Sequence, residues 1–179
     1  GFNKFIITVN YLGNKIEKYL GDGEKFGCKI KYIREKNFLG TAGSLSLIKK
    51  MLFKEPLLVM NSDIITSVNF DSLIDYHKTN KAHITICAKN YRNISLFGEL
   101  DIKKNRVYSI IEKPVKDVFV NSGIYVLNPN ILKFIKNKKL QMTDLVNFFI
   151  KKKKKVVYYP IFENWADIGN KRDLIKFIK

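Results

Sequence analysis

The chain has 179 residues, of which 46% are hydrophobic and 27% charged, and its formal net charge is +17. This length suits one domain that buries most of its apolar surface, and no apolar stretch approaches the roughly 20 residues that a membrane span needs. Cys28 and Cys87 lie in strand-like runs without metal-ligand spacing, and no basic and apolar leader opens the chain. Both features favour a reducing cytoplasm.

Lysine supplies most of the positive charge. Only four of the 33 basic residues are arginine, whereas proteins that read base edges rely on the planar fork of arginine. The run Lys151–Lys155 follows an apolar, helix-like segment, and cations suit the C-terminus of a helix. We therefore expect a solvated basic surface that attracts anionic small substrates, with a nucleic-acid or membrane partner as the less favoured alternative.

The first third of the chain has a β-α-β rhythm, with strand-like and helix-like runs separated by glycine and proline. Ser44 follows a glycine-broken loop and can cap the next helix. The unbroken apolar run that ends at Met60 predicts a central strand of a covered sheet. The expected elements are strands at 4–10, 29–34 and 57–60 and helices at 16–20 and 44–53.

The pattern then changes to short strands without intervening helices, which predicts an antiparallel excursion on a parallel sheet. The fold class is therefore α/β, a three-layer Rossmann-like mixed sheet with a small antiparallel lobe. The remaining expected elements are strands at 83–88, 97–102, 107–112, 118–127, 156–160 and 164–167 and helices at 70–78, 131–135, 144–151 and 171–178.

Two aspartates follow strand-like runs. Asp63 closes the segment that contains the run 57–60, and Asp167 ends the segment 164–167. In open α/β sheets ligands bind beyond the carboxyl ends of strands, and Mg²⁺ takes a few carboxylate oxygens together with water and substrate phosphates. Either acid could instead cap a helix or turn. Together they predict a metal site for a nucleotide in one cleft.

Other segments carry weaker signals. The loop Gly40–Gly43 can bring backbone amides close to an anion, although its spacing matches neither a P-loop nor a dinucleotide fingerprint. Lys113, between Glu112 and a proline, could neutralise a phosphate or form a surface ion pair. Asn121 suits recognition of a hydroxyl group or a turn, and Gly98 permits close backbone approach or a bulge.

Taken in order, six segments resemble the sugar-1-phosphate nucleotidyltransferases, and within that family the mannose-1-phosphate guanylyltransferase-like branch. They are VNYLG at 9–13, GTAGS at 40–44, LVMNSD at 58–63, EKP at 112–114, NSGIY at 121–125 and WADIG at 165–169. The resemblance implies the nucleotide-diphospho-sugar transferase fold. It also implies transfer of a nucleotidyl group from a nucleoside triphosphate, GTP in this branch, to a sugar 1-phosphate, with release of pyrophosphate.

The resemblance implies roles by position. Asp63 and Lys113 would act in catalysis. The implied contacts are Mg²⁺ with Asp63 and Asp167, the nucleotide with Gly40, Thr41 and Gly43, the sugar with Gly98, Glu112 and Asn121, and the sugar phosphate with Lys113.

The family's first strand and its glycine-rich loop, whose Arg and Lys grip the triphosphate, have no counterpart in residues 1–179. We therefore expect a single, N-terminally incomplete domain with unpaired strand edges and poor activity of these residues alone. Two other functions stay open: a non-catalytic nucleotide-sugar-binding module and, less favoured, a metal-dependent glycosyltransferase. Glycosyltransferases usually have two acids separated by one residue, whereas Asn61 and Ile65 stand two positions from Asp63. The resemblance also leaves a homo-oligomer open.

Overall fold

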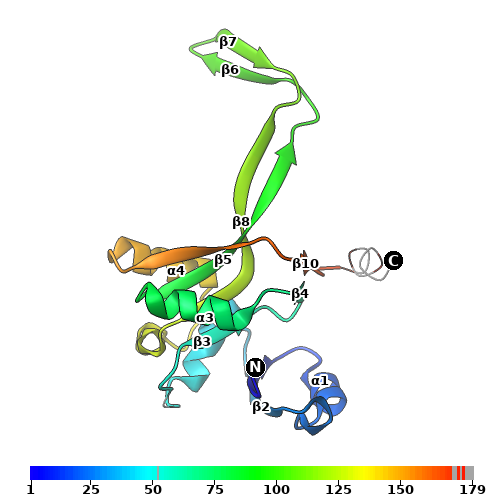
Figure 1. The fold of residues 1–179 in the computed structure, drawn as a ribbon, viewed down its shortest axis with the longest axis vertical. Coiled ribbons are helices and arrows are strands. Elements are labelled where there is room, and N and C mark those ends of the chain that lie inside the picture. Colours follow the sequence, from blue (N-terminus) through cyan, green and yellow to red (C-terminus); the bar gives the residue numbers. More distant parts are fainter. Residues whose placement is uncertain (52, 171–172, 174, 176–179) are drawn as a thin grey trace.

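A mixed sheet forms the centre of the molecule (Figure 1). The computed structural model describes residues 1–51, 53–170, 173 and 175. The sheet has the order β3–β8–β5–β9, with bounds Leu57–Met60, Val115–Leu127, Ile84–Ile94 and Val156–Ile161. Strand β8 runs antiparallel to both β3 and β5, whereas β9 runs parallel to β5. The expected α/β class with a mixed sheet is confirmed.

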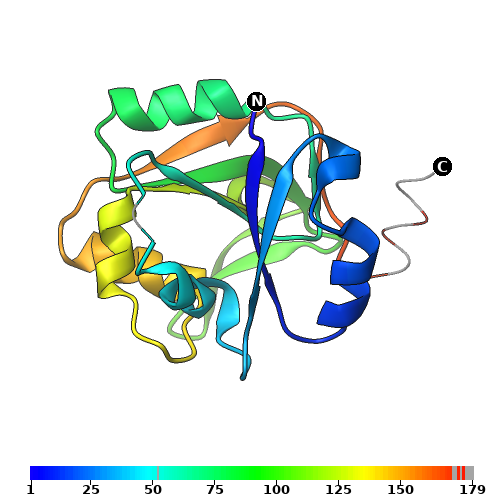
Figure 2. The same ribbon diagram turned by 90° about the horizontal axis from the view of Figure 1, so that it is seen from below.

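Helices cover both faces of this sheet (Figure 2). Successive strand residues point to opposite faces, so Tyr125 and Leu127 join one buried cluster whereas Ile124 and Val126 join the other. No helix among the described residues is long and apolar enough to span a membrane. Helix α3 (Phe70–Thr79) lies on one face, and α2 (Gly40–Gly43), η2 (Ser44–Ile48), η3 (Pro129–Phe134) and α4 (Met142–Lys151) lie on the other. The three-layer expectation is confirmed.

The N-terminal β-α-β unit forms a sheet of its own. Strands β1 (Lys4–Val9) and β2 (Lys29–Arg34) are parallel, and α1 (Gly13–Leu20) and η1 (Glu24–Phe26) connect them. Among the described residues β1 pairs only with β2, and β3 pairs only with β8. Each of these two strands therefore has one edge without a strand partner.

An arm projects from the body of the molecule (Figure 1). It consists of the outer halves of β5 and β8 and the hairpin of β6 (Glu99–Lys103) and β7 (Arg106–Ile111). This arm is the expected antiparallel lobe. The sequence interpretation did not anticipate that β8 continues from the arm into the middle of the central sheet, where residues 122–127 are buried.

Several expectations are wrong in detail. Residues 40–43 form a short helix that continues into η2, so Ser44 is a buried residue within the helical segment and not an N-cap. Strand β3 has an antiparallel neighbour on one side only, so among the described strands it is not central. A strand that was not expected, β4 (Ile64–Thr66), pairs with β10 (Trp165–Asp167). The helix expected at 171–178 lies outside the described residues, apart from 173 and 175.

Candidate active site

Asp63 and Asp167 come from neighbouring positions of the two-stranded ribbon β4–β10. Asp63 directly precedes β4, and Ile64 of that strand lies opposite Asp167. The backbone amide of Ile168 donates to the carbonyl oxygen of Asp63 at 2.8 Å. Both aspartates are exposed to solvent. The ribbon therefore brings together two carboxylates that lie far apart in the sequence.

The two carboxylates repel each other. Partial burial raises the pKa of Asp167, and the negative charges of Asp63 and then Asp173 raise it further. A divalent cation between the first two would relieve this repulsion. The described residues hold no group of three or more His, Cys, Asp or Glu that could bind a metal ion. The pair fits Mg²⁺, which commonly uses one or two carboxylates and completes its shell with water and substrate oxygens.

Two side chains fix the ribbon to the central sheet through three hydrogen bonds. The ammonium of Lys89 on β5 donates to the carbonyl oxygens of Glu163 at 2.8 Å and Phe162 at 3.3 Å, just ahead of β10. The indole N–H of Trp165 donates to the carbonyl oxygen of Ser122 at 2.9 Å. The sequence interpretation missed Lys89, although a lysine directly after the apolar run 84–88 already indicates a polar partner.

Asn121 lies beside the segment that leads to Asp63. Its amide nitrogen donates to the hydroxyl of Tyr125 at 2.5 Å, and its amide oxygen accepts from the backbone N–H of Gly123 at 3.2 Å. The backbone N–H of Asn61 in turn donates to the carbonyl oxygen of Gly123 at 3.0 Å. Gly123 has φ +75°, and a Cβ there would lie 2.9 Å from the side-chain amide nitrogen of Asn61. These contacts place Asn121 next to the strand end that carries the first aspartate.

Gly98, Glu112 and Lys113 lie together on the arm. A Cβ on Gly98 would stand 3.1 Å from a carboxylate oxygen of Glu112, and Lys113 adopts a left-handed φ of +44°. Strand β8 separates them from Asn121: at about 3.3 Å per residue, the stretch from Val115 to Asn121 is about 20 Å long. The structure therefore does not bring this group together with Asn121 and the aspartates.

Gly40, Thr41 and Gly43 pack on the segment that precedes α4. The amides of Ala42 and Gly43 both donate to the carbonyl oxygen of Leu140 at 3.0 Å, and the backbone N–H and hydroxyl of Thr41 donate to the side-chain oxygen of Gln141. A Cβ would lie 2.7 Å from the carbonyl oxygen of Leu140 at Gly40, and 2.5 Å from that of Lys138 at Gly43. Close packing therefore accounts for both glycines without a ligand. No described contact joins this group to the aspartate pair.

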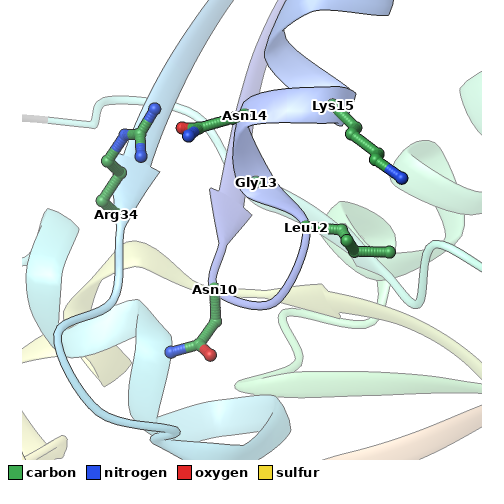
Figure 3. Close-up of a pocket in the computed structure, with 6 residues that line it drawn as sticks. All are labelled: Asn10, Leu12, Gly13, Asn14, Lys15 and Arg34. Carbon is green, nitrogen blue, oxygen red and sulfur yellow. The ribbon is translucent and has the colours of Figure 1, made fainter.

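A separate pocket of about 340 Å³ lies at the N-terminus of α1 (Figure 3). Its lining includes Lys15 and Arg34, but the guanidinium of Arg34 is already paired with a carboxylate oxygen of Glu17 at 2.7 Å. None of the residues that the sequence assigned to the site lines this pocket. Its lining residues are Asn10, Leu12, Gly13, Asn14, Lys15 and Arg34.

Relatives share both the sequence and the architecture. The chain is 30% identical to a mannose-1-phosphate guanyltransferase of Debaryomyces hansenii over 98% of this chain and 51% of the relative, and 31% identical to a mannose-1-phosphate guanylyltransferase catalytic subunit beta of Dictyostelium discoideum over 98% and 50%. The chain thus spans about half the length of these curated relatives.

The fold is also that of solved structures. HddC from Yersinia pseudotuberculosis superimposes with a TM-score of 0.75 at 24% identity, over 98% of this chain and 77% of that one. A putative glucose-1-phosphate thymidylyltransferase from Bacillus anthracis gives 0.72 at 21%, over 96% and 73%. The family described as "Nucleotidyl transferase" matches residues 1–179. The chain therefore belongs to the nucleotidyl transferase family.

Proposed function

We propose that the protein transfers a nucleotidyl group from a nucleoside triphosphate, preferably GTP, to a sugar 1-phosphate, preferably mannose 1-phosphate. The family match over the whole chain supports the reaction class, and the similarity to mannose-1-phosphate guanyltransferases supports the choice of substrates. The observation that carries the proposal is the β4–β10 ribbon, in which Asp63 and Asp167 are exposed neighbours.

In the proposed reaction an oxygen of the sugar 1-phosphate attacks the α-phosphorus of the triphosphate. The bond from that phosphorus to the oxygen that bridges to the β-phosphate breaks, and its electron pair leaves with pyrophosphate. Such a transfer needs positioning and charge neutralisation more than covalent help from the protein. In the proposal Asp63 and Asp167 hold Mg²⁺, which neutralises phosphate oxygens when it is bound. Neither aspartate forms a bond to the substrate.

The sugar side of the proposed site needs a movement of the arm. Asn121 already lies beside the aspartate segment, whereas Gly98, Glu112 and Lys113 lie on the arm. For these three to contact the same sugar phosphate, the arm must bend toward the body. Spin labels at Ser109 on the arm and Thr79 on α3, both exposed, in a Cys28→Ser background, test this by pulsed electron paramagnetic resonance. We expect sugar 1-phosphate with GTP and Mg²⁺ to shift the distance to shorter values. An unchanged distance contradicts the sugar roles of Glu112 and Lys113.

The nucleotide roles of Gly40, Thr41 and Gly43 are also part of the proposal. The backbone N–H groups of Thr41 and Gly43 donate to Gln141 and Leu140, so a nucleotide there must share or displace the contact between Thr41 and Gln141. We expect Gln141→Ala to change the KM for the triphosphate and to leave the KM for the sugar phosphate within about twofold. Steady-state kinetics with each substrate varied in turn measures both constants. An unchanged KM for the triphosphate contradicts these nucleotide contacts.

The direct test is pyrophosphate release by the full-length protein with each nucleoside triphosphate and each of several sugar 1-phosphates. We expect GTP with mannose 1-phosphate to be fastest. Asp63→Asn and Asp167→Asn should each lower kcat by at least about a hundredfold, because each removes a charge that acts in the transition state. Asp71→Asn, which removes an exposed carboxylate on α3, is the matched control and should keep its rate.

Each other outcome has a clear meaning. Full activity of Asp63→Asn refutes the metal role of that residue. Binding of a nucleotide sugar without any pyrophosphate release favours a non-catalytic binding module. Transfer of the sugar from a nucleotide sugar to another acceptor favours a metal-dependent glycosyltransferase.

A further inference from the structure

Lysine is concentrated on the side of the molecule formed by η3, α4 and the turn after α4. Residues 133–155 contain nine of the 29 lysines of the chain and a single acid, Asp144. All nine are exposed, and none belongs to an ion pair among the described residues. We call this surface the basic face, and its lysines are Lys133, Lys136, Lys138, Lys139, Lys151, Lys152, Lys153, Lys154 and Lys155.

Two partly exposed phenylalanines lie within the basic face. Phe134 of η3 is 49% exposed and Phe148 of α4 is 42% exposed. Their ring centroids are 6.3 Å apart, so the two elements meet at this point. The ammonium of Lys133 lies 5.6 Å from the ring centre of Phe134, and Lys151 follows Phe148 by three helical positions, on the neighbouring turn. Positive charges therefore flank a small apolar protrusion.

The basic face lies away from the aspartate pair of the candidate active site. Figures 1 and 2 both show η3 and α4 on one side of the body and β10, next to β4, on the other. A partner that covers the basic face would leave the pair Asp63 and Asp167 accessible.

The chemistry of this surface favours anionic lipid over nucleic acid. All nine of its cations are lysine, which acts as a point charge, whereas nucleic-acid readers favour the planar arginine fork. Base stacking also needs free ring faces, but the ring of Phe134 already contacts both Phe148 and Phe149. Lysines around half-exposed aromatic residues suit the headgroup region, where the charges meet anionic lipid and the rings enter the acyl boundary.

We propose that the basic face docks the protein on the surface of an anionic lipid bilayer. The lysines at 133–139 and 151–155 attract the anionic headgroups, and the rings of Phe134 and Phe148 insert shallowly into the bilayer. The docking is peripheral and salt-sensitive, because the Debye length shortens as salt rises. It uses no residue of the β4–β10 ribbon, and of its lysines only Lys138 and Lys139 lie in the segment that packs on Gly40–Gly43.

The test is co-sedimentation of the full-length protein with vesicles of phosphatidylcholine, with or without phosphatidylserine. We expect binding only to vesicles that contain phosphatidylserine, and release at high salt. Equal binding to neutral vesicles, or no binding to either kind, overturns the proposal. Strong retention on single- or double-stranded nucleic acid without vesicle binding overturns it in favour of a nucleic-acid partner.

Matched variants separate a built surface from general positive charge. Lys151→Gln/Lys152→Gln/Lys154→Gln should weaken partitioning at least about tenfold. Lys29→Gln/Lys31→Gln/Lys36→Gln removes the same charge from exposed positions on and after β2 and should change it less than about twofold. Equal losses in the two triple variants contradict a specific face.

The aromatic contribution has its own pair of variants. Phe148→Ala should weaken partitioning about three- to tenfold, whereas Phe26→Ala, which removes a 53% exposed ring from η1, should leave it unchanged. Melting temperatures of both variants show whether they are folded. Should Phe148→Ala fail to fold, blue-shifted emission from a tryptophan in a Phe134→Trp variant upon vesicle addition reports insertion, and unchanged emission contradicts it.

Discussion

Strands β5 and β8 pair with each other in two different environments, on either side of a register shift between Ile86 and Ala88. At the body end, Ile84, Ile124 and Val126 are fully buried between helices. At the arm end, from the pair Asn90–Phe119 to the pair Ile94–Val115, every residue of both strands is exposed, and so is every residue of β7 beyond them. The two strands are paired antiparallel at both ends. The difference shows that helices on both faces, and not strand pairing, bury the apolar surface.

The same contrast separates the candidate site residues. Asp63, Asp167 and Asn121 lie at the body, where Lys89 and Trp165 tie the ribbon to the sheet. Glu112 and Lys113 lie on the arm, and an isolated two-stranded hairpin is marginally stable in water. Elements with little buried surface open at low free-energy cost, and segments that move during function are often of this kind. Substitutions in the body and on the arm should therefore differ in their effects.

The largest effect is expected from truncating isoleucines of the two regions. Ile124→Ala removes a fully buried side chain between α3 and the sheet and should lower the free energy of unfolding by about 2–5 kcal/mol. Ile110→Ala acts on a side chain that is 67% exposed on the arm and should change it by less than about 0.5 kcal/mol. Urea unfolding measures both. Equal losses would mean that the arm is as tightly packed as the body.

A pair of glycines gives a smaller contrast. Gly43→Ala puts a Cβ 2.5 Å from the carbonyl oxygen of Lys138, which is backbone and cannot move cheaply, and should cost about 1–3 kcal/mol. The nearest atom to a Cβ in Gly98→Ala belongs to the flexible carboxylate of Glu112 at 3.1 Å, and the next two lie at ordinary contact distance, so the substitution should cost less than about 1 kcal/mol. Thermal unfolding of the two variants, with Gly1→Ala as a control in open space, distinguishes them. A Gly98→Ala variant that is the less stable of the two would contradict the contrast.

Acidic pH should lower the free energy of unfolding of the body. Burial, with a smaller contribution from His83, lowers the pKa of His77 below its ordinary value of 6.5, and its Nδ1 lies 2.8 Å from the hydroxyl of Thr85. Because the pKa of folded His77 is lowered, the unfolded chain binds this proton more readily below pH 6.5 than the folded chain does, so the free energy of unfolding decreases as the pH falls. His77→Asn should be less stable at pH 8 but should lose less stability between pH 7 and about 5. An identical pH slope in the variant would exclude His77 as the cause.

The smallest effect is expected for an ion pair on the arm. Arg92 and Asp117 lie 3.3 Å apart with side chains 69% and 52% exposed. Solvent screens such pairs, so a double-mutant cycle with Arg92→Gln and Asp117→Asn should give a coupling energy below about 0.5 kcal/mol. A coupling above about 1 kcal/mol would mean that the arm is shielded from solvent.

Local patterns predicted most of the elements. The bounds expected for β2 and β3 agree with the structure, because composition and flanking turn residues mark short strands well. The helix at Gly40–Gly43 was missed because its amides bond to Leu140, far away in the sequence. Strand β4 was missed for the same reason: three residues become a strand only by pairing with β10.

The proximity of the two candidate aspartates, which lie on one ribbon, could be predicted from the sequence, whereas the position of the arm could not. Asp63 and Asp167 both follow recognisable strand-like runs. The place of Glu112 depends on how far β8 extends beyond the body. In this strand Val115, Val118 and Phe119 are apolar although they are exposed, so composition does not mark where the body ends. The distance between Glu112 and Asn121 therefore could not be predicted from the sequence pattern.

The central claim is that Asp63 and Asp167 jointly hold one divalent cation, and Mn²⁺ titration followed by electron paramagnetic resonance tests it most directly. In the presence of GTP, we expect the full-length protein to bind Mn²⁺ with competition by Mg²⁺. Asp63→Asn and Asp167→Asn should each weaken this binding at least about tenfold, and the double variant should weaken it little further. Unchanged Mn²⁺ affinity in either single variant would contradict the shared site.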